Sequence, residues 1–131
     1  SEHPFVKEWN LGENLSPSLE AYLQLRIVVA ALNEGWEPQF TKDEVRWYPW
    51  FWLYTQKELD EMSVEEKKER RMMDVRDRVS EHYAGFGYAY SHGAPSLTYA
   101  TLGSRLCLKS EELATYCGKQ FIDLWSYFNL G

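Results

Sequence analysis

The sequence predicts an α+β protein in which a small antiparallel sheet of about three strands has helices packed mainly on one face. Helical spacing of apolar residues opens and closes the chain, and stretches rich in aromatic residues lie between. The segments follow the order α-β-α-β-β-α, which favours a mixed fold. The length of 131 residues fits one domain, which we expect over residues 15–131 after an N-terminal arm of residues 1–14.

Composition supports a folded protein of unusual aromatic content. Aromatic residues make up 16% of the chain and include six Trp, so large flat side chains should dominate either the core or a contact surface. No apolar run reaches the length that spans a bilayer, and the first residues do not resemble a signal peptide. We therefore expect a soluble cytoplasmic protein with no membrane partner.

The first helix is predicted from Ser16 to Asn33. Ser16 followed by Pro17 is an N-cap with proline at the first helical position, and Gly35 is placed to end the helix. Its apolar stripe widens until the middle of the helix is apolar nearly all round, which predicts a place in the core.

An edge strand, or two short strands with a bend, is predicted next, from Val45 to Thr55, because Pro49 cannot donate to a sheet ladder. A helical turn or short helix is expected over Gln56–Met62. The capping-box pattern of Ser63 and Glu66 then predicts a charged helix over residues 63–81, which either docks at one end or forms a mobile insertion.

A second strand is predicted over Tyr83–Ser91, with Phe86, Tyr88 and Tyr90 on one face. The other face carries glycine, which lets another backbone approach closely. Leu97–Leu108 is predicted to return as the second strand of a hairpin. Ser110 caps the last helix, whose apolar residues repeat at helical spacing as far as Phe128.

Charge is distributed unevenly along the chain. The net charge is −6, and residues 1–62 hold 11 acids and 5 bases while the rest is balanced. An acidic chain lacks the field that draws proteins to phosphate backbones, so nucleic-acid binding is disfavoured though not excluded. Cys107 and Cys117 are interpreted as reduced, buried thiols.

Three stretches carry a resemblance to known sequences: Ala31–Trp36, Tyr48–Phe51, and Gly103–Ala114 continuing through Gly118–Phe121. Together they resemble a family of small uncharacterised proteins encoded by phages and mobile elements of gut Bacteroidales. The resemblance implies a setting for the protein, the cytoplasm of a bacterial host cell, and it implies no activity, cofactor or catalytic residue.

The first candidate binding surface is the face of Phe86, Tyr88 and Tyr90. It resembles the aromatic strand of RNA-recognition modules, whose rings stack on bases, but Ala84 occupies the position of the basic residue. Packing of these rings in the core is the favoured interpretation.

The second candidate is the row formed by Tyr48, Trp50, Trp52 and Tyr54, which share one face if the strand is regular. An edge strand cannot easily bury both faces, so one row should face solvent or a partner. The alternative is that the 63–81 helix or the arm covers this row, and the sequence leaves the two equally open.

Other chemistry has weak support. His82, His92 and the two cysteines lack the paired spacing of zinc sites, and nothing orients a cysteine–histidine pair. We expect no metal, cofactor or catalytic residue. Arg105 projects from a predicted strand between apolar neighbours, so its charge should need an acid, a helix C-terminus or a bound anion. An ion pair is favoured, with Glu20 and Glu34 as candidates.

The sequence therefore predicts a non-enzymatic phage or mobile-element accessory protein that binds a host or phage protein through an exposed aromatic and acidic surface. The alternative is a single-stranded nucleic-acid-binding protein that uses aromatic stacking. The oligomeric state is left open. The expected binding residues are Tyr48, Trp50, Trp52, Tyr54, Phe86, Tyr88, Tyr90 and Arg105.

Overall fold

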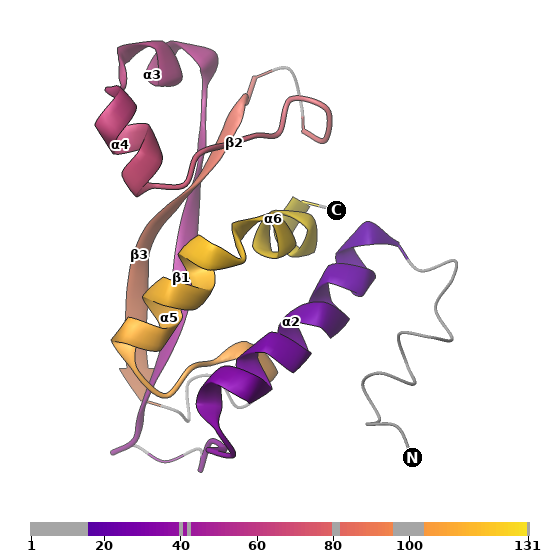
Figure 1. Cartoon of the computed structure of the whole chain (residues 1–131), viewed down its shortest axis with the longest axis vertical. Helices are drawn as coiled ribbons and strands as arrows, with labels where there is room; N and C mark the ends of the chain where they lie inside the picture. Colours follow the sequence, from indigo (N-terminus) through magenta and orange to yellow (C-terminus); the bar gives the residue numbers. More distant parts are fainter. Residues whose placement is uncertain (1–15, 40, 42, 80–81, 96–103, 131) are drawn as a thin grey trace.

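A long two-stranded ribbon with helices along one side organises the molecule (Figure 1). The computed structural model describes residues 16–39, 41, 43–79, 82–95 and 104–130. The strands form one antiparallel sheet in the order β1-β3-β2, which confirms the α+β class. The elements are α2 (Pro17–Asn33), β1 (Val45–Tyr54), α3 (Gln56–Glu61), α4 (Val64–Glu69), β2 (Met73–Asp74), β3 (Gly85–Pro95), a 3₁₀ turn (Ser104–Leu106), α5 (Glu111–Gln120) and α6 (Ile122–Leu130). The N-terminal arm lies outside the described residues.

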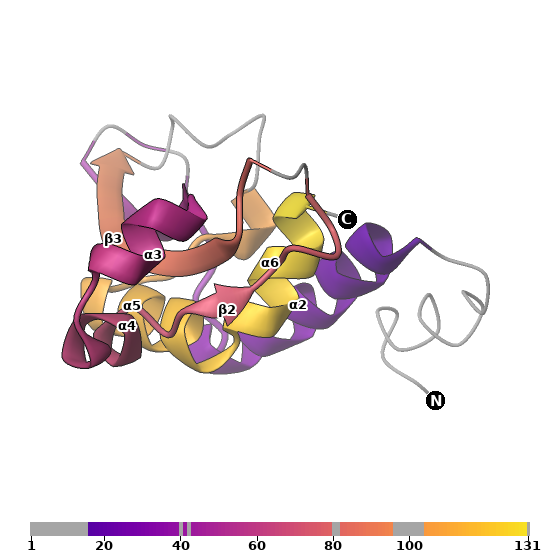
Figure 2. The ribbon, with the colours of Figure 1, turned by 90° about the horizontal axis from the view of Figure 1, so that it is seen from above.

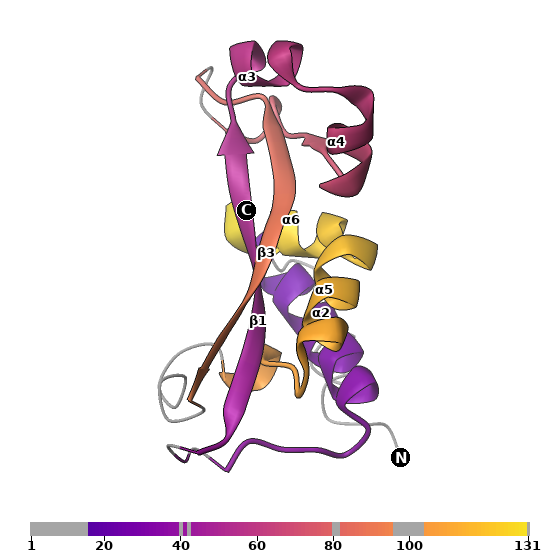
Figure 3. The same ribbon diagram turned by 90° about the vertical axis from the view of Figure 1, so that its left-hand side faces the viewer.

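The three longest helices lie on one side of the β1–β3 ribbon (Figure 3), as the sequence predicts. α5 and α6 lie between the ribbon and α2, and α3 and α4 sit at one end of the ribbon (Figures 1 and 2). The core fills the interfaces between these layers. Leu25 and Val29 of α2, Leu106 and Leu108, and Trp125 of α6 are almost completely inaccessible to solvent.

α2 begins and ends where the sequence predicts. The Ser16 hydroxyl accepts a hydrogen bond from the backbone N–H of Leu19 at 3.2 Å, which caps the helix. The helix ends where Glu34 adopts a left-handed backbone with φ 48°, and Gly35 follows with φ 87°. The signals at both ends are local, so the bounds are readable without the rest of the fold.

Asn33 joins the end of α2 to the segment that precedes α5. Its side-chain amide donates to the carbonyl of Cys107 at 3.0 Å, and its carbonyl oxygen accepts from the backbone N–H of Lys109 at 3.1 Å. Asn33 is buried, and because both ends of its amide group are satisfied its burial carries no unpaired polar group.

A bulge in β3 changes which of its side chains point toward the helices. β1 and β3 pair from end to end, but the register passes directly from Trp50↔Tyr90 to Phe51↔Tyr88. Ala89 is therefore the extra residue on β3. Since successive strand residues point to opposite faces, this extra residue lets Tyr88 point toward the helices while Tyr90 points away.

The charged helix predicted over residues 63–81 is wrong beyond Glu69. Arg71 adopts φ 54°, and the N–H groups of Arg71 and Met72 donate to the carbonyls of Lys68 and Lys67 at 3.1 and 3.0 Å. This pair of hydrogen bonds ends α4 as a Schellman turn. The chain then pairs with β3 as the short strand β2.

Gly85 and Gly87 give the physical reason for this departure. A Cβ atom on Gly85 would lie 3.0 Å from both Leu59 and Met72, and one on Gly87 would lie 3.3 Å from the carbonyl oxygen of Arg70. The bare side of β3 thus admits close approach of another backbone, as predicted. These tertiary contacts join residues that are distant in sequence. The local helix signals at residues 63–66 could therefore not reveal them.

The last third of the chain differs from the predicted hairpin. β3 pairs with β1 and β2, and the predicted partner strand lies partly outside the described residues, at positions 97–103. Its described part forms a 3₁₀ turn and a single bridge from Leu108 to Trp47. The final helix begins after Ser110 as predicted, but it divides at Phe121 into α5 and α6.

Candidate functional site

The strongest surface feature is a group of exposed aromatic rings on the β1–β3 ribbon. Trp50, Trp52 and Tyr90 have exposed fractions of 50%, 56% and 47%. His92 is also exposed and lies against Trp50. We call Trp50, Trp52, Tyr90 and His92 the aromatic patch.

Three rings of the patch are in contact, since the ring of Trp50 meets those of Tyr90 and His92. Trp50 and Tyr90 stack with ring centroids 6.4 Å apart and planes 7° apart, and the His92 ring meets Trp50 edge-on at 6.2 Å. Such cross-strand aromatic pairs stabilise a sheet and limit the rotamers that each ring can adopt. Docking of a partner here would therefore cost less side-chain entropy than docking on a surface whose side chains are mobile.

The opposite side of the same strands is filled by the core. Phe51 stacks on Phe86 at 4.9 Å and also contacts Trp125 at 5.7 Å. The Tyr88 hydroxyl lies 2.7 Å from that of Ser91 and 3.1 Å from that of Thr115 on α5. Other rings already fill this side of the strands. The rings of the aromatic patch therefore lie at the surface although the core is well packed.

A hollow of about 310 Å³ adjoins the patch along the edge of β1. Trp50, Trp52 and Leu53 line one side of it, and Asn129 and Leu130 at the end of α6 line another. An exposed apolar surface beside a hollow offers a place where a partner side chain can be buried.

The structure separates the predicted binding residues into four groups: exposed rings, buried rings, half-buried tyrosines and Arg105. Trp50, Trp52 and Tyr90 are together at the surface. Phe86 and Tyr88 are buried, with exposed fractions of 3% and 8%, so the core interpretation of these two rings is confirmed and their placement in a binding surface is wrong. Tyr90 departs from them because of the bulge at Ala89, which strand alternation alone could not predict.

Tyr48 and Tyr54 are half-buried and contribute little to the surface. Tyr48 meets the core ring of Trp125 edge-on at 5.7 Å. Tyr54 lies near Arg70, and burial raises the pKa of its phenol, with the Arg70 charge opposing that change. The predicted row of four rings is thus reduced to Trp50 and Trp52.

Arg105 does not occupy the environment that the sequence predicts. It belongs to the 3₁₀ turn and is exposed, so its charge is solvated and needs no buried acid. The Glu34 carboxylate lies instead 3.9 Å from the ammonium of Lys109. The expected ion pair of Arg105 with Glu20 or Glu34 is therefore wrong.

Both cysteines are free and buried. Burial raises the pKa of the Cys107 thiol to about 12 and that of Cys117 to about 11. The thiols are thus protonated at neutral pH, and a protonated thiol is a weak nucleophile. His82 and His92 are both exposed, whereas the two thiols are buried. Among the described residues no group of three or more His, Cys, Asp or Glu side chains is placed to hold a metal ion.

His92 is the member of the patch that sequence reasoning missed. The sequence suggests it only as a metal ligand or base, because its place opposite β1 depends on a register that is not visible locally. The pairing of Tyr48 with His92 in the ladder places it beside Trp50. The only signal in the sequence is the alternating spacing of aromatic residues in the strand, which His92 continues.

Two further findings concern the chain as a whole. In the part of the chain that the structure describes, no helix is both long and apolar enough to cross a bilayer. Comparison with known protein families, with curated proteins and with solved structures finds no significant match.

Proposed function

We propose that this protein is a non-enzymatic binding protein that docks another protein through its aromatic patch. The observation that carries the proposal is the half-exposed state of Trp50 and Trp52 on a ribbon whose other side is fully packed. Trp and Tyr are the residue types that most often dominate the binding energy of protein interfaces.

The charge of the chain favours a basic partner. The net charge is −6, and its excess lies in residues 1–62, which include β1. A negative field attracts a basic surface over distances comparable to the Debye length of about 8 Å at physiological salt. The acids would therefore speed encounter, while the aromatic rings would hold the complex together.

The phage or mobile-element setting stays a prediction, and it names the lysate in which to look for the partner. The tagged chain is used to capture proteins from a gut Bacteroidales lysate, and the retained proteins are quantified for wild type and for Trp50→Ala/Trp52→Ala. We expect the double variant to lose a specific partner by more than tenfold, because a buried Trp anchor contributes about 2 kcal/mol or more.

The matched control is Tyr116→Ala, which removes an exposed ring of similar accessibility from α5. This variant should retain the partner, and circular dichroism should show that all variants are folded. Equal retention by wild type and by a folded Trp50→Ala/Trp52→Ala variant would exclude the patch as the binding surface.

Nucleic-acid stacking is the competing interpretation of the same rings. It predicts that oligothymidylate quenches the tryptophan fluorescence of wild type at low salt and that added salt reverses the quenching. Quenching that is lost in Trp50→Ala/Trp52→Ala would reassign the patch from protein to nucleic acid.

A further inference from the structure

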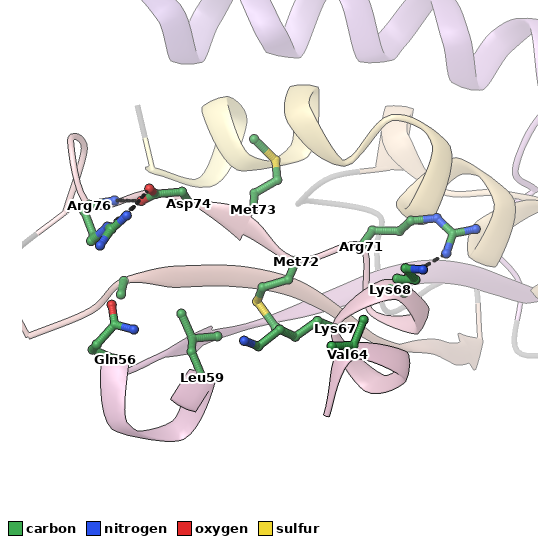
Figure 4. Close-up of a pocket in the computed structure, with 11 residues that line it drawn as sticks. Gln56, Leu59, Val64, Lys67, Lys68, Arg71, Met72, Met73, Asp74 and Arg76 are labelled. Atoms are coloured by element: carbon green, nitrogen blue, oxygen red, sulfur yellow. Dashed lines mark hydrogen bonds and ion pairs between the residues drawn. The ribbon is translucent and has the colours of Figure 1, made fainter. Parts of the chain in front are cut away.

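An open groove of about 690 Å³ lies between α3, α4 and β2 (Figure 4). It is separate from the aromatic patch, since the two share no lining residue. Its apolar surface comes from Leu59, Val64, Met72 and Met73. Methionine side chains are flexible and polarisable, so they adapt to apolar groups of different shapes.

The charged residues of the groove are mostly basic. Lys67, Lys68, Arg71 and Arg76 line it against a single acid, Asp74. Asp74 is engaged by Arg76, with Nε–Oδ1 and Nη2–Oδ2 distances of 3.0 and 2.5 Å.

The other three cations are Lys67, Lys68 and Arg71, and Arg71 is partly engaged, since its Nη1 donates to the carbonyl of Lys68 at 2.7 Å. Among the described residues, no acidic side chain forms an ion pair with Lys67, Lys68 or Arg71. Figure 4 shows Lys67 extending from α4 toward Leu59, so one of these cations lies beside the apolar surface. A basic groove on a chain of net charge −6 is a local reversal of the overall field.

Arg71 supports the same conclusion by its backbone. Its φ of 54° occupies the left-handed position that closes a Schellman turn, where glycine is the usual residue. Strained backbone of this kind is concentrated at functional sites. Here it places a guanidinium-bearing residue at the wall of the groove, which glycine would not do.

We propose that this groove binds an acidic peptide segment of a partner protein, with an apolar side chain against Leu59 and Met72 and carboxylates on Lys67, Lys68 and Arg71. The groove is too open to enclose most of a small molecule, as ligand pockets usually do. A nucleic acid fits less well, because among the described residues no aromatic ring on which a base could stack lines the groove, whereas Leu59 and Met72 offer an apolar surface to an aliphatic side chain.

The methionines provide a direct test. The chain has three, Met62, Met72 and Met73, and only Met72 and Met73 line the groove. Protein labelled with ¹³C at the methionine methyls is titrated with peptide. The peptide concentration is raised to about 1 mM, at which weak binding is detected. The probe is a mixture of short peptides in which Asp or Glu alternates with Leu, Val or Phe. We expect the Met72 and Met73 signals to shift and the Met62 signal to stay.

Charge-matched variants show whether the cations act. Lys67→Gln and Arg71→Gly should each weaken binding about tenfold, since each removes one charge-assisted contact. Lys67→Arg keeps the charge and should bind as wild type. Lys57→Gln makes the same change as Lys67→Gln at an exposed lysine of α3 outside the groove, and it should have no effect.

Several outcomes would overturn the proposal. These are the absence of any Met72 or Met73 shift, equal shifts at Met62, and equal shifts with peptides that carry Lys in place of the acids. Oligothymidylate that shifts the same two signals more strongly would assign the groove to nucleic acid. Trp50→Ala/Trp52→Ala should retain the shifts, so failure of the aromatic patch and failure of the groove can be told apart.

Discussion

The ring of Trp50 lies parallel to that of Tyr90 on the neighbouring strand, with centroids 6.4 Å apart, although Tyr88, two residues earlier, is buried on the opposite side. The single extra residue Ala89 between them produces this arrangement. It brings a ring from β3 to the same surface as Trp50, and so builds an exposed aromatic surface from two strands.

Replacing Tyr90 tests the importance of this stack. Tyr90→Ala should lower the free energy of unfolding by about 0.5–1 kcal/mol, because it removes an aromatic cross-strand pair. It should also move the fluorine NMR signal of Trp50, in protein labelled with 5-fluorotryptophan, toward its value in the unfolded chain. Tyr90→Phe keeps the ring and should change neither quantity. If the two variants behave alike, stacking of the ring is not what orders Trp50.

Much of the helical structure could be predicted from the sequence because its signals are local. Ser16, Pro17 and Gly35 bound α2, the box formed by Thr55 and Glu58 caps α3, and each acts within one helical turn. The edge position of β1 was similarly predicted from one proline. Such features need no knowledge of the tertiary structure.

The remaining features depend on residues distant in sequence. Residues 63–70 carry helix signals, yet the chain leaves the helix because Met72 packs on Gly85 and Gly87. The candidate site was predicted only in part, because the faces of some of its residues also depend on contacts distant in sequence. Trp50 and Trp52 followed from strand alternation, whereas the faces of Tyr88 and Tyr90 depend on a bulge that no local pattern marks.

Gly118 marks the closest approach of α5 to the ribbon. A Cβ atom there would lie 2.7 Å from the Cβ of Pro49 and 3.0 Å from the Tyr88 ring. Gly118→Ala should therefore destabilise the protein by about 1–3 kcal/mol, even though alanine is the better helix former by about 1 kcal/mol. Urea denaturation measures the change. Gln120→Ala, at an exposed position of α5, is the control and should stay within about 0.5 kcal/mol of wild type.

The left-handed backbone of Arg71 predicts a second difference in stability between glycine and alanine. Arg71→Gly should be more stable than Arg71→Ala by about 1 kcal/mol, since only a side chain with a Cβ atom is strained at a φ of 54°. Both variants remove the guanidinium, so their difference isolates the backbone. Thermal unfolding compares them. An alanine variant as stable as the glycine variant would mean that the turn relaxes and that Arg71 holds no strain.

The buried thiols predict how stability depends on alkaline pH. Burial raises the pKa of Cys107 from 9.0 to about 12 and that of Cys117 to about 11. Above about pH 9 the thiols of the unfolded chain lose their protons while those of the folded protein keep them, so the unfolded state gains stability. The contribution is complete below pH 9 and is lost as the pH rises toward 11–12, by at most about 1.4 kcal/mol per pH unit for each thiol.

Replacing both cysteines by alanine separates this effect from the titration of lysine and tyrosine in the same range. The double variant Cys107→Ala/Cys117→Ala should show a shallower fall in the free energy of unfolding between pH 9 and 10.5 than wild type, measured by urea denaturation at each pH. Only the slope is compared, because the loss of two buried side chains lowers stability at every pH. Identical slopes would show that the thiols ionise as readily in the folded protein as in the unfolded chain.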